Sequence, residues 1–181
     1  MDMNSDEKDR IYNGAKDNAA GVASVLAIAK AFKRASSPPK RSILFAFVGA
    51  EEQGLLGSAY FARYPTFDPG KIAANVNIDS PQVYGKTSDI SFIGYGRSSV
   101  DVIAETVADF QSRSITGDQN PSAGYFYRSD HFSLAKIGVP SLNFKGGSQF
   151  TGRQFSSIDV LQARYVAELY HQPSDEIESN W

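Results

Sequence analysis

Apolar residues after Asn18 recur every three or four positions, up to a run of two serines and two prolines at 36–39. This is helical spacing, because residues three and four apart lie on one face of a helix. Prolines in turn end a helix. We therefore expect an amphipathic helix here, with one face in the core; its apolar positions are Val22, Val25, Leu26, Ala29 and Phe32.

Two stretches have the pattern of buried strands. Residues 42–48, SILFAFV, form a continuous apolar run that ends at Gly49. Such a run is typical of a strand covered on both faces. Residues 72–78, IAANVNI, form a second run that ends at Asp79. Between them, residues 55–63 are expected to form a short helix.

The same alternation continues to the end of the sequence. We expect strands at 89–93 and 139–144 and helices at 98–110 and 157–170. This order predicts one α/β domain over residues 1–181, a three-layer sandwich with a mixed, largely parallel sheet, after a polar leader at 1–10. Ligands bind such sheets outside the carboxyl ends of the strands, where Glu51, Glu52 and Asp79 fall.

Composition excludes several classes of partner, metal site and nucleophile. The net charge is −2 and no basic tract is present, which argues against nucleic acid and anionic membranes as partners. The absence of cysteine excludes disulfides, thiolate metal sites and a cysteine nucleophile. With two histidines in the sequence, a three-histidine zinc site is impossible, and no G-x-S-x-G elbow follows a strand. Any metal site must therefore be rich in carboxylates.

The adjacent pair Glu51 and Glu52 is the first candidate. Two carboxylates at the mouth of a buried strand repel each other unless a cation or a shared proton offsets the cost. The ordinary alternative is that both acids lie in the first turn of a helix, where the helix dipole favours negative charge. A metal ligand beside a general base is the functional interpretation.

Four other polar residues have both an ordinary and a functional interpretation. Asp17, in NGAKDNAAG, could cap the following helix, and Asp79, in IDSP, could form an Asx turn. His171 could complement the dipole at the end of the last helix. A structural or supporting role is the favoured interpretation of His131, because it lies at an expected strand-to-helix junction among aromatic residues.

Four segments in this order, GAKDNAAG, FVGAEEQGLLGS, NVNIDSP and YHQPSDE, resemble the motifs of the co-catalytic di-zinc aminopeptidases. That family of zinc exopeptidases includes relatives of bacterial leucyl aminopeptidase, glutamate carboxypeptidase and glutaminyl cyclase. The resemblance runs from about Ile11 to the end, and FYRSDHFSLAKIGVP also looks like the bacterial aminopeptidases. It implies a phosphorylase/hydrolase-like sandwich.

The resemblance also implies a role for each candidate. Asp17 would bridge two zinc ions, Glu52 and His171 would complete one ion, and Asp79 would bind the other. Glu51 would be the catalytic general base. Independently of the family, hard oxygens with one imidazole suit zinc, manganese or cobalt.

One family feature is missing. Family members carry a further histidine ligand in a His-x-Asp motif, on a strand shortly before the segment that matches NGAKDNAAG, and this sequence has no such motif there. We therefore expect the chain to be the carboxyl-terminal portion of a longer protein, without its early strands; a naturally short form is the alternative. Catalysis should be impaired, with one zinc ion or none bound, because one site keeps only Asp17 and Asp79.

The favoured function is an aminopeptidase that hydrolyses the amino-terminal bond of a peptide. The alternatives are a carboxypeptidase, for which Arg128 could bind the terminal carboxylate, a glutaminyl cyclase, and a non-catalytic scaffold. Tyr127 is a weak candidate for stabilising the oxyanion. Export is expected from the resemblance alone, and an exposed sheet edge could pair with a second copy.

Overall fold

A four-stranded mixed sheet forms the centre of the protein. The computed structural model describes residues 10–151, 158–179 and 181. The sheet has the order β1-β4-β2-β3, in which β1 pairs with β4 and β2 with β3 in parallel, while β2 and β4 are antiparallel. The strands are β1 (Asn75–Ile78), β2 (Asp89–Ile93), β3 (Ser114–Thr116) and β4 (Ser141–Gly146). The predicted α/β class with a mixed sheet is confirmed.

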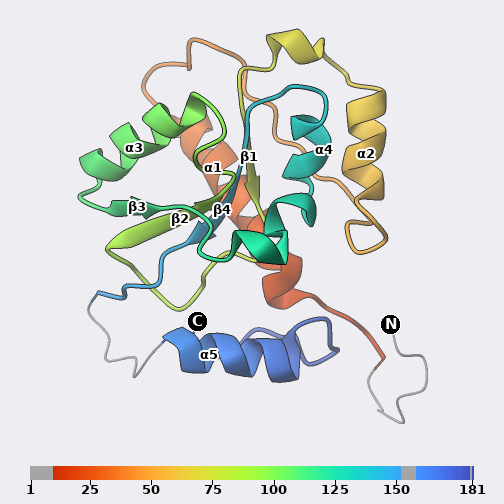
Figure 1. The fold of residues 1–181 in the computed structure, drawn as a ribbon, viewed down its shortest axis with the longest axis vertical. Coiled ribbons are helices and arrows are strands. Elements are labelled where there is room, and N and C mark those ends of the chain that lie inside the picture. Colours follow the sequence, from red (N-terminus) through yellow and green to blue (C-terminus); the bar gives the residue numbers. More distant parts are fainter. Residues whose placement is uncertain (1–9, 152–157, 180) are drawn as a thin grey trace.

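Helices surround this sheet (Figure 1). In that view α1 passes behind β1 and β4, and α5 lies across the lower end of the molecule. The α-helices are α1 (Ala20–Arg34), α2 (Leu56–Arg63), α3 (Val100–Phe110), α4 (His131–Ala135) and α5 (Ile158–Arg164). Two π-helical segments adjoin them, η1 (Ala15–Ala19) before α1 and η5 (Tyr165–Leu169) after α5, and short 3-10 turns are η2 (Pro69–Lys71), η3 (Pro121–Ala123) and η4 (Tyr125–Tyr127).

Most predicted elements are present. The helices expected at 55–63 and 98–110 appear as α2 and α3, and the strand at 89–93 is β2. The last helix appears as α5 followed by η5; its predicted first residue, Ser157, lies outside the described residues. The strand expected at 139–144 begins and ends two residues later, as β4. The sequence patterns missed β3 and α4, which are only three and five residues long.

The hydrophobic core lies where α3 meets the sheet. Phe92 of β2, Val100 of α3 and Leu142 of β4 are buried against one another. The rings of Phe92 and Phe144 meet edge to face with centroids 5.7 Å apart. This cluster holds β2 and β4 together, and β4 in turn positions β1, whose carboxyl end leads to Asp79.

The prediction of a strand at 42–48 is wrong. These residues have no regular secondary structure, and their apolar side chains are largely exposed, with Leu44 and Phe47 each 52% accessible. A strand covered on both faces needs hydrogen-bonded neighbours in a sheet, and no described strand pairs with this stretch.

The predicted core face of α1 is also only partly covered, since Leu26 is 56% exposed and Phe32 43%. The strand predicted at 72–78 is shortened to β1 at the edge of the sheet, where Val76 is 57% exposed. Within the described residues, no helix combines the length and the hydropathy needed to cross a membrane.

Candidate metal centre

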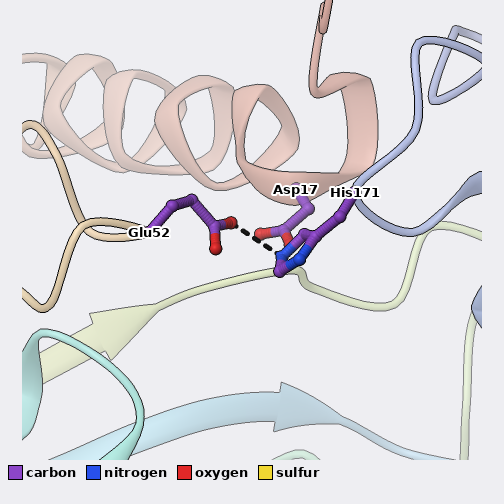
Figure 2. A group of neighbouring side chains, drawn as sticks. All are labelled: Asp17, Glu52 and His171. Atoms are coloured by element: carbon purple, nitrogen blue, oxygen red, sulfur yellow. Dashed lines mark ion pairs between the residues drawn. The ribbon is translucent and has the colours of Figure 1, made fainter. Parts of the chain in front are cut away.

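Three side chains from distant parts of the sequence converge at one point (Figure 2). His171 Nε2 lies 2.8 Å from Glu52 Oε1 and 3.3 Å from Asp17 Oδ2. One ligand atom from each residue lies within 4.8 Å of the other two. Asp17 comes from the kinked turn of η1 before α1, Glu52 from the turn before α2, and His171 from the segment after η5.

Asp17 is positioned by a buried carboxylate near the end of the sequence. Asp175 is 2% exposed and accepts hydrogen bonds from the backbone N–H groups of Lys16, at 3.1 and 3.2 Å, and Asp17, at 3.0 Å. The Ala15 N–H donates to the Asp175 carbonyl oxygen at 3.0 Å. These contacts fix the turn that carries Asp17 against the segment that carries His171.

Asn18 joins the same turn to the end of β1. Its amide nitrogen donates to the Ile78 carbonyl oxygen at 3.0 Å, and its amide oxygen accepts from the N–H groups of Gly21 and Ser80, both at 3.1 Å. Ile78 and Ser80 flank Asp79. One side chain therefore sets the position of Asp79 relative to Asp17.

The two glutamates lie in a tight turn that depends on glycine. The Glu51 carbonyl oxygen accepts from the N–H groups of Gly54 and Leu55 at 3.0 and 2.8 Å, and Gly57 N–H donates to the Gly49 carbonyl oxygen at 3.0 Å. A Cβ on Gly57 would lie 2.4 Å from that oxygen, which is too close for any other residue. The glycines of FVGAEEQGLLGS thus allow the turn that presents Glu51 and Glu52.

Burial, together with the crowding of carboxylates, raises the pKa values of Asp17 and Glu51. The pKa of Asp17 rises to about 6 because the group is partly buried and lies near Asp79 and Glu52. The pKa of Glu51 rises to about 7, first through burial and then through Asp79, Glu52 and Asp130. A bound cation would relieve this repulsion, and a carboxyl group with a pKa near 7 can both accept and donate a proton at neutral pH.

Asp79 lies near this centre but belongs to a different set of contacts. Ser129 Oγ donates to Asp79 Oδ2 at 2.6 Å, and Lys145 Nζ donates to the Asp79 carbonyl oxygen at 3.0 Å. Asp79 raises the pKa of both Asp17 and Glu51, so it shares their electrostatic environment. Among the described residues, the close group of metal-binding side chains contains Asp17, Glu52 and His171 but not Asp79.

The three convergent residues fit a zinc ion. Zinc binds imidazole nitrogen and carboxylate oxygen at about 2.0–2.2 Å, so the ligands of one tetrahedral ion lie roughly 3.3–3.6 Å apart. The two contacts of His171 Nε2, at 2.8 and 3.3 Å, require only small side-chain movements to reach that geometry. Two oxygens and one imidazole leave a fourth position open, as in catalytic zinc sites.

The remaining candidates differ in their surroundings. His131 is completely buried, its ring meets Phe126 edge to face, and neither ring nitrogen has a hydrogen-bond partner among the described residues. Tyr127 and Arg128 are exposed. Sequence reasoning missed Asn18 and Asp175, although each stands inside a quoted motif, next to or near a candidate ligand.

Comparison with known proteins identifies the family. Residues 2–181 match Peptidase family M28. Aminopeptidase YwaD of Bacillus subtilis is 31% identical over 174 residues, which cover 91% of this chain and 33% of the relative. Leupeptin-inactivating enzyme 1 of Streptomyces exfoliatus is 29% identical over 139 residues, which cover 76% of this chain and 30% of the relative. The chain thus spans about a third of the length of these curated relatives.

The fold is also similar to that of solved structures. The structure of BSAP, a zinc aminopeptidase from Bacillus subtilis, superposes with a TM-score of 0.59 at 27% identity over 80% of this chain and 35% of that one. LapA aminopeptidase of Legionella pneumophila superposes with a TM-score of 0.64 at 20% identity, over 91% of this chain and 40% of that one, a likeness of fold. Because the family match extends over nearly the whole sequence, this chain belongs to peptidase family M28.

Proposed function

We propose that this chain is the zinc-binding part of an aminopeptidase that hydrolyses the amino-terminal bond of a peptide. The observation that carries the proposal is the convergence of Asp17, Glu52 and His171 within 4.8 Å, from three segments far apart in the sequence. Family membership and two relatives described as aminopeptidases support this choice.

Each residue has a distinct part in the proposed chemistry. Asp17, Glu52 and His171 hold zinc. The ion, when bound, polarises the scissile carbonyl group and lowers the pKa of its water. Glu51 accepts a proton from the attacking water and donates it to the departing amine, a task that suits a carboxyl group whose pKa is about 7.

A second zinc ion would be bound by Asp17 and Asp79. The proposed bridging role of Asp17 is compatible with its nearness to Asp79, which helps to raise the pKa of Asp17. Two carboxylates make a weak zinc site, however, and Asp79 already accepts a hydrogen bond from Ser129. We therefore propose that the chain alone binds one zinc ion firmly, the second weakly or not at all, and that its turnover is reduced.

Aminoacyl-p-nitroanilides test the proposal most directly. The zinc-loaded chain should cleave them faster than peptides with a carboxyl-terminal glutamate, and it should not cyclise amino-terminal glutamine. Glu51→Gln should abolish turnover while the variant still binds zinc, because Glu51 transfers protons and is not a ligand. Unchanged turnover in that variant would reject the role of Glu51. Zinc binding without any turnover would favour a scaffold.

Export, which the resemblance suggests, also stays a proposal. Its test is whether the protein, expressed in its source cells, is recovered outside the cytoplasm. Recovery in the cytoplasm alone would contradict it.

A further inference from the structure

A cavity of about 360 Å³ lies away from the candidate metal centre. Its lining comes from the loop between β2 and α3, from η4, from α4 and from the segment that enters β4. Asp79 follows the carboxyl end of β1, whereas the cavity borders the amino end of its parallel neighbour β4, so about 13 Å of strand separates the two levels. In Figure 1, the loop from α4 to β4 lies at the top of the view and the segment after α5 at the bottom. The cavity is therefore separate from the candidate zinc ligands.

Two cationic side chains border this cavity, and each lies over a phenyl ring. The guanidinium carbon of Arg97 lies 4.4 Å from the ring centroid of Phe126, and Lys136 Nζ lies 4.9 Å from that of Phe132. Both rings line the cavity and meet edge to face, with centroids 6.0 Å apart. Cation–π contacts thus hold two positive charges beside an apolar surface.

Neither cation is neutralised by a carboxylate among the described residues. No ion pair in that part of the chain involves Arg97 or Lys136, and the lining of the cavity includes no acidic residue. Asp101 accepts hydrogen bonds from the backbone N–H groups of Gly96 and Ser98, at 3.1 and 3.2 Å. Its carboxylate thus supports the backbone on both sides of Arg97. Two unpaired positive charges at one cavity attract an anion.

The carbonyl groups at the end of α4 are satisfied by local hydrogen bonds. Gly138 N–H donates to the Ala135 carbonyl oxygen at 3.0 Å, and Val139 N–H donates to that of Leu134 at 3.2 Å. These contacts occupy carbonyl groups that would otherwise present negative charge at the helix end. An anion beside Lys136 is therefore not opposed by the end of this helix.

The rest of the lining is largely apolar. Ala135, Val139 and Pro140 accompany the two phenyl rings. The Ser98 hydroxyl oxygen accepts from the Val100 N–H at 3.4 Å, which leaves its own proton available to a ligand. The volume falls within the roughly 300–1,000 Å³ of small-molecule sites. An apolar wall beside two cations fits a ligand with an apolar group and a negatively charged end.

We propose that this cavity binds a carboxylate that carries an aromatic or branched aliphatic group, at a site separate from the metal centre. Arg97 binds the carboxylate through its fork of N–H donors, and Lys136 adds to the positive potential. The apolar group packs against Phe126 and Phe132. A free amino acid fits less well, because the lining offers no acid for its ammonium group. The site goes beyond the proposed function and does not depend on it.

The experiment titrates the protein with 3-phenylpropionate in EDTA, without zinc, and follows the backbone amide signals by NMR. The signals of residues 97–98 and 136–139 should shift, whereas those of 145–147, near Asp79, should not. Acetate lacks the apolar group, and 3-phenylpropionamide lacks the charge. Each should bind at least about tenfold more weakly than 3-phenylpropionate.

Substitutions separate the charges from the cavity itself. Arg97→Gln should weaken binding of 3-phenylpropionate by about tenfold, and Lys136→Gln by about threefold, because the first loses a charge-assisted hydrogen bond and the second a nearby charge. Both residues are exposed, so the free energy of unfolding should change little. Ala135→Leu should abolish binding with every charge retained, since the longer side chain fills the cavity. Lys33→Gln, at an exposed lysine on α1, is the matched control and should leave the affinity unchanged.

The ligand chemistry has two sources, a free apolar acid and the carboxyl terminus of a peptide that ends in an apolar residue. N-acetyl-glycyl-phenylalanine distinguishes them. Tighter binding than that of 3-phenylpropionate would assign the cavity to peptide carboxyl termini, and weaker binding would assign it to free acids. Either result supports the site.

Equal affinity for the acid and its amide would overturn the proposal, and so would an affinity that Arg97→Gln and Lys136→Gln leave unchanged. Acetate that binds as tightly as 3-phenylpropionate would overturn it too, because the apolar group would then contribute nothing. Shifts confined to 145–147 would place the anion at the metal centre and reject the cavity. Because zinc is absent throughout, these outcomes are independent of the proposed aminopeptidase activity.

Discussion

His171 Nε2 lies 2.8 Å from Glu52 Oε1, although the two residues belong to separate motifs near the end and in the first third of the sequence. The contact joins the turn before α2 to the segment after η5, and Asp17 completes the group. Among the described residues, no strand pairing joins these three segments. A cation held between them would therefore contribute directly to folding stability as well as to chemistry.

Removal of one ligand should therefore remove most zinc affinity. We expect His171→Ala and Glu52→Gln each to weaken zinc binding by about 100-fold or more, because two ligands remain and a two-ligand site is weak. Calorimetric titration of the metal-free protein with zinc measures this change. Asp109→Asn is the matched control, since Asp109 is an exposed carboxylate on α3 and should leave the affinity unchanged.

The same titration tests the number of ions. A stoichiometry of one tightly bound zinc ion, lost in both variants, is the expected result. Two tight equivalents in the unmodified chain would contradict the weakness proposed for the site of Asp17 and Asp79. If Asp109→Asn lost as much zinc affinity as His171→Ala and Glu52→Gln, the zinc would be bound nonspecifically by carboxylates.

A second prediction concerns His131 and acid stability. Burial and, to a lesser extent, the positive charge of Lys145 lower the pKa of His131 to about 4, while Asp79 acts in the opposite direction. The ring therefore stays neutral in the folded state at pH values where the unfolded chain, in which its pKa is near 6.5, binds a proton. The unfolded state thus binds more protons between about pH 4 and 6.5, and stability falls as the pH is lowered through that range. From pH 7.5 to 5, this group should cost about 2 kcal/mol.

Urea unfolding of His131→Leu in EDTA checks this effect. The free energy of unfolding of the variant, minus that of the unmodified chain, should be larger at pH 5 than at pH 7.5. Phe132→Leu, a change at the adjacent aromatic residue, should show no such dependence on pH. A pH-independent difference for His131→Leu would mean that the ring is protonated in the folded state or does not stay buried.

Sequence patterns could predict the elements whose burial is decided locally. Helices α2 and α3 and strand β2 occur where periodicity and length indicated them. The prediction failed for the stretch at 42–48 because a buried strand needs a neighbour in the sheet, and the described chain provides none. A pattern records the environment for which a segment is suited, not whether that environment is present.

The candidate site could likewise be predicted from the sequence only in part. Asp17, Glu52 and His171 could be named in advance, because ordered motifs carry the residue types that zinc requires. Asp175 and Asn18 could not, since their roles arise from hydrogen bonds to backbone groups of other segments. The position of Asp79, bonded to Ser129 and outside the close group, depends likewise on packing that the spacing of motifs does not reveal.

Asp175 provides a third prediction, on both stability and zinc binding. Its buried carboxylate accepts from the backbone N–H groups of Lys16 and Asp17. Asp175→Ala should destabilise the protein by about 2–3 kcal/mol, because buried donors lose a charged acceptor. It should also weaken zinc binding, since the turn with Asp17 loses its anchor. Denaturant unfolding and zinc titration measure the two effects.

Glu176→Gln is the neighbouring control for Asp175. Glu176 is exposed, and its side chain accepts a hydrogen bond from Asn13 at the surface, so its change should have little effect on either quantity. Equal losses in the two variants would contradict a specific role for Asp175. A loss of stability in Asp175→Ala without any loss of zinc affinity would show that the buried carboxylate supports the fold but does not position Asp17.

Asn18 allows a sharper test of positioning, because one substitution separates its two hydrogen-bonding groups. Asn18→Asp keeps an oxygen for the N–H groups of Gly21 and Ser80 but loses the donor to the Ile78 carbonyl oxygen. It also adds a negative charge beside Asp17 and Asp79. Asn18→Ala loses all three bonds without adding charge. Stability should therefore fall in both variants, and more in Asn18→Ala at high salt, where charge repulsion is screened.

Zinc binding should separate the two Asn18 variants in the same order but with the opposite dependence on salt. Added negative charge attracts a cation, so Asn18→Asp should retain more affinity at low salt than Asn18→Ala, and this advantage should shrink as salt screens the charge. Ser24→Ala, which removes only a hydroxyl bond to the Ala20 carbonyl oxygen on α1, is the control. Equal zinc affinity in Asn18→Ala and the unmodified chain would mean that Asp17 reaches its place without the bridge to β1.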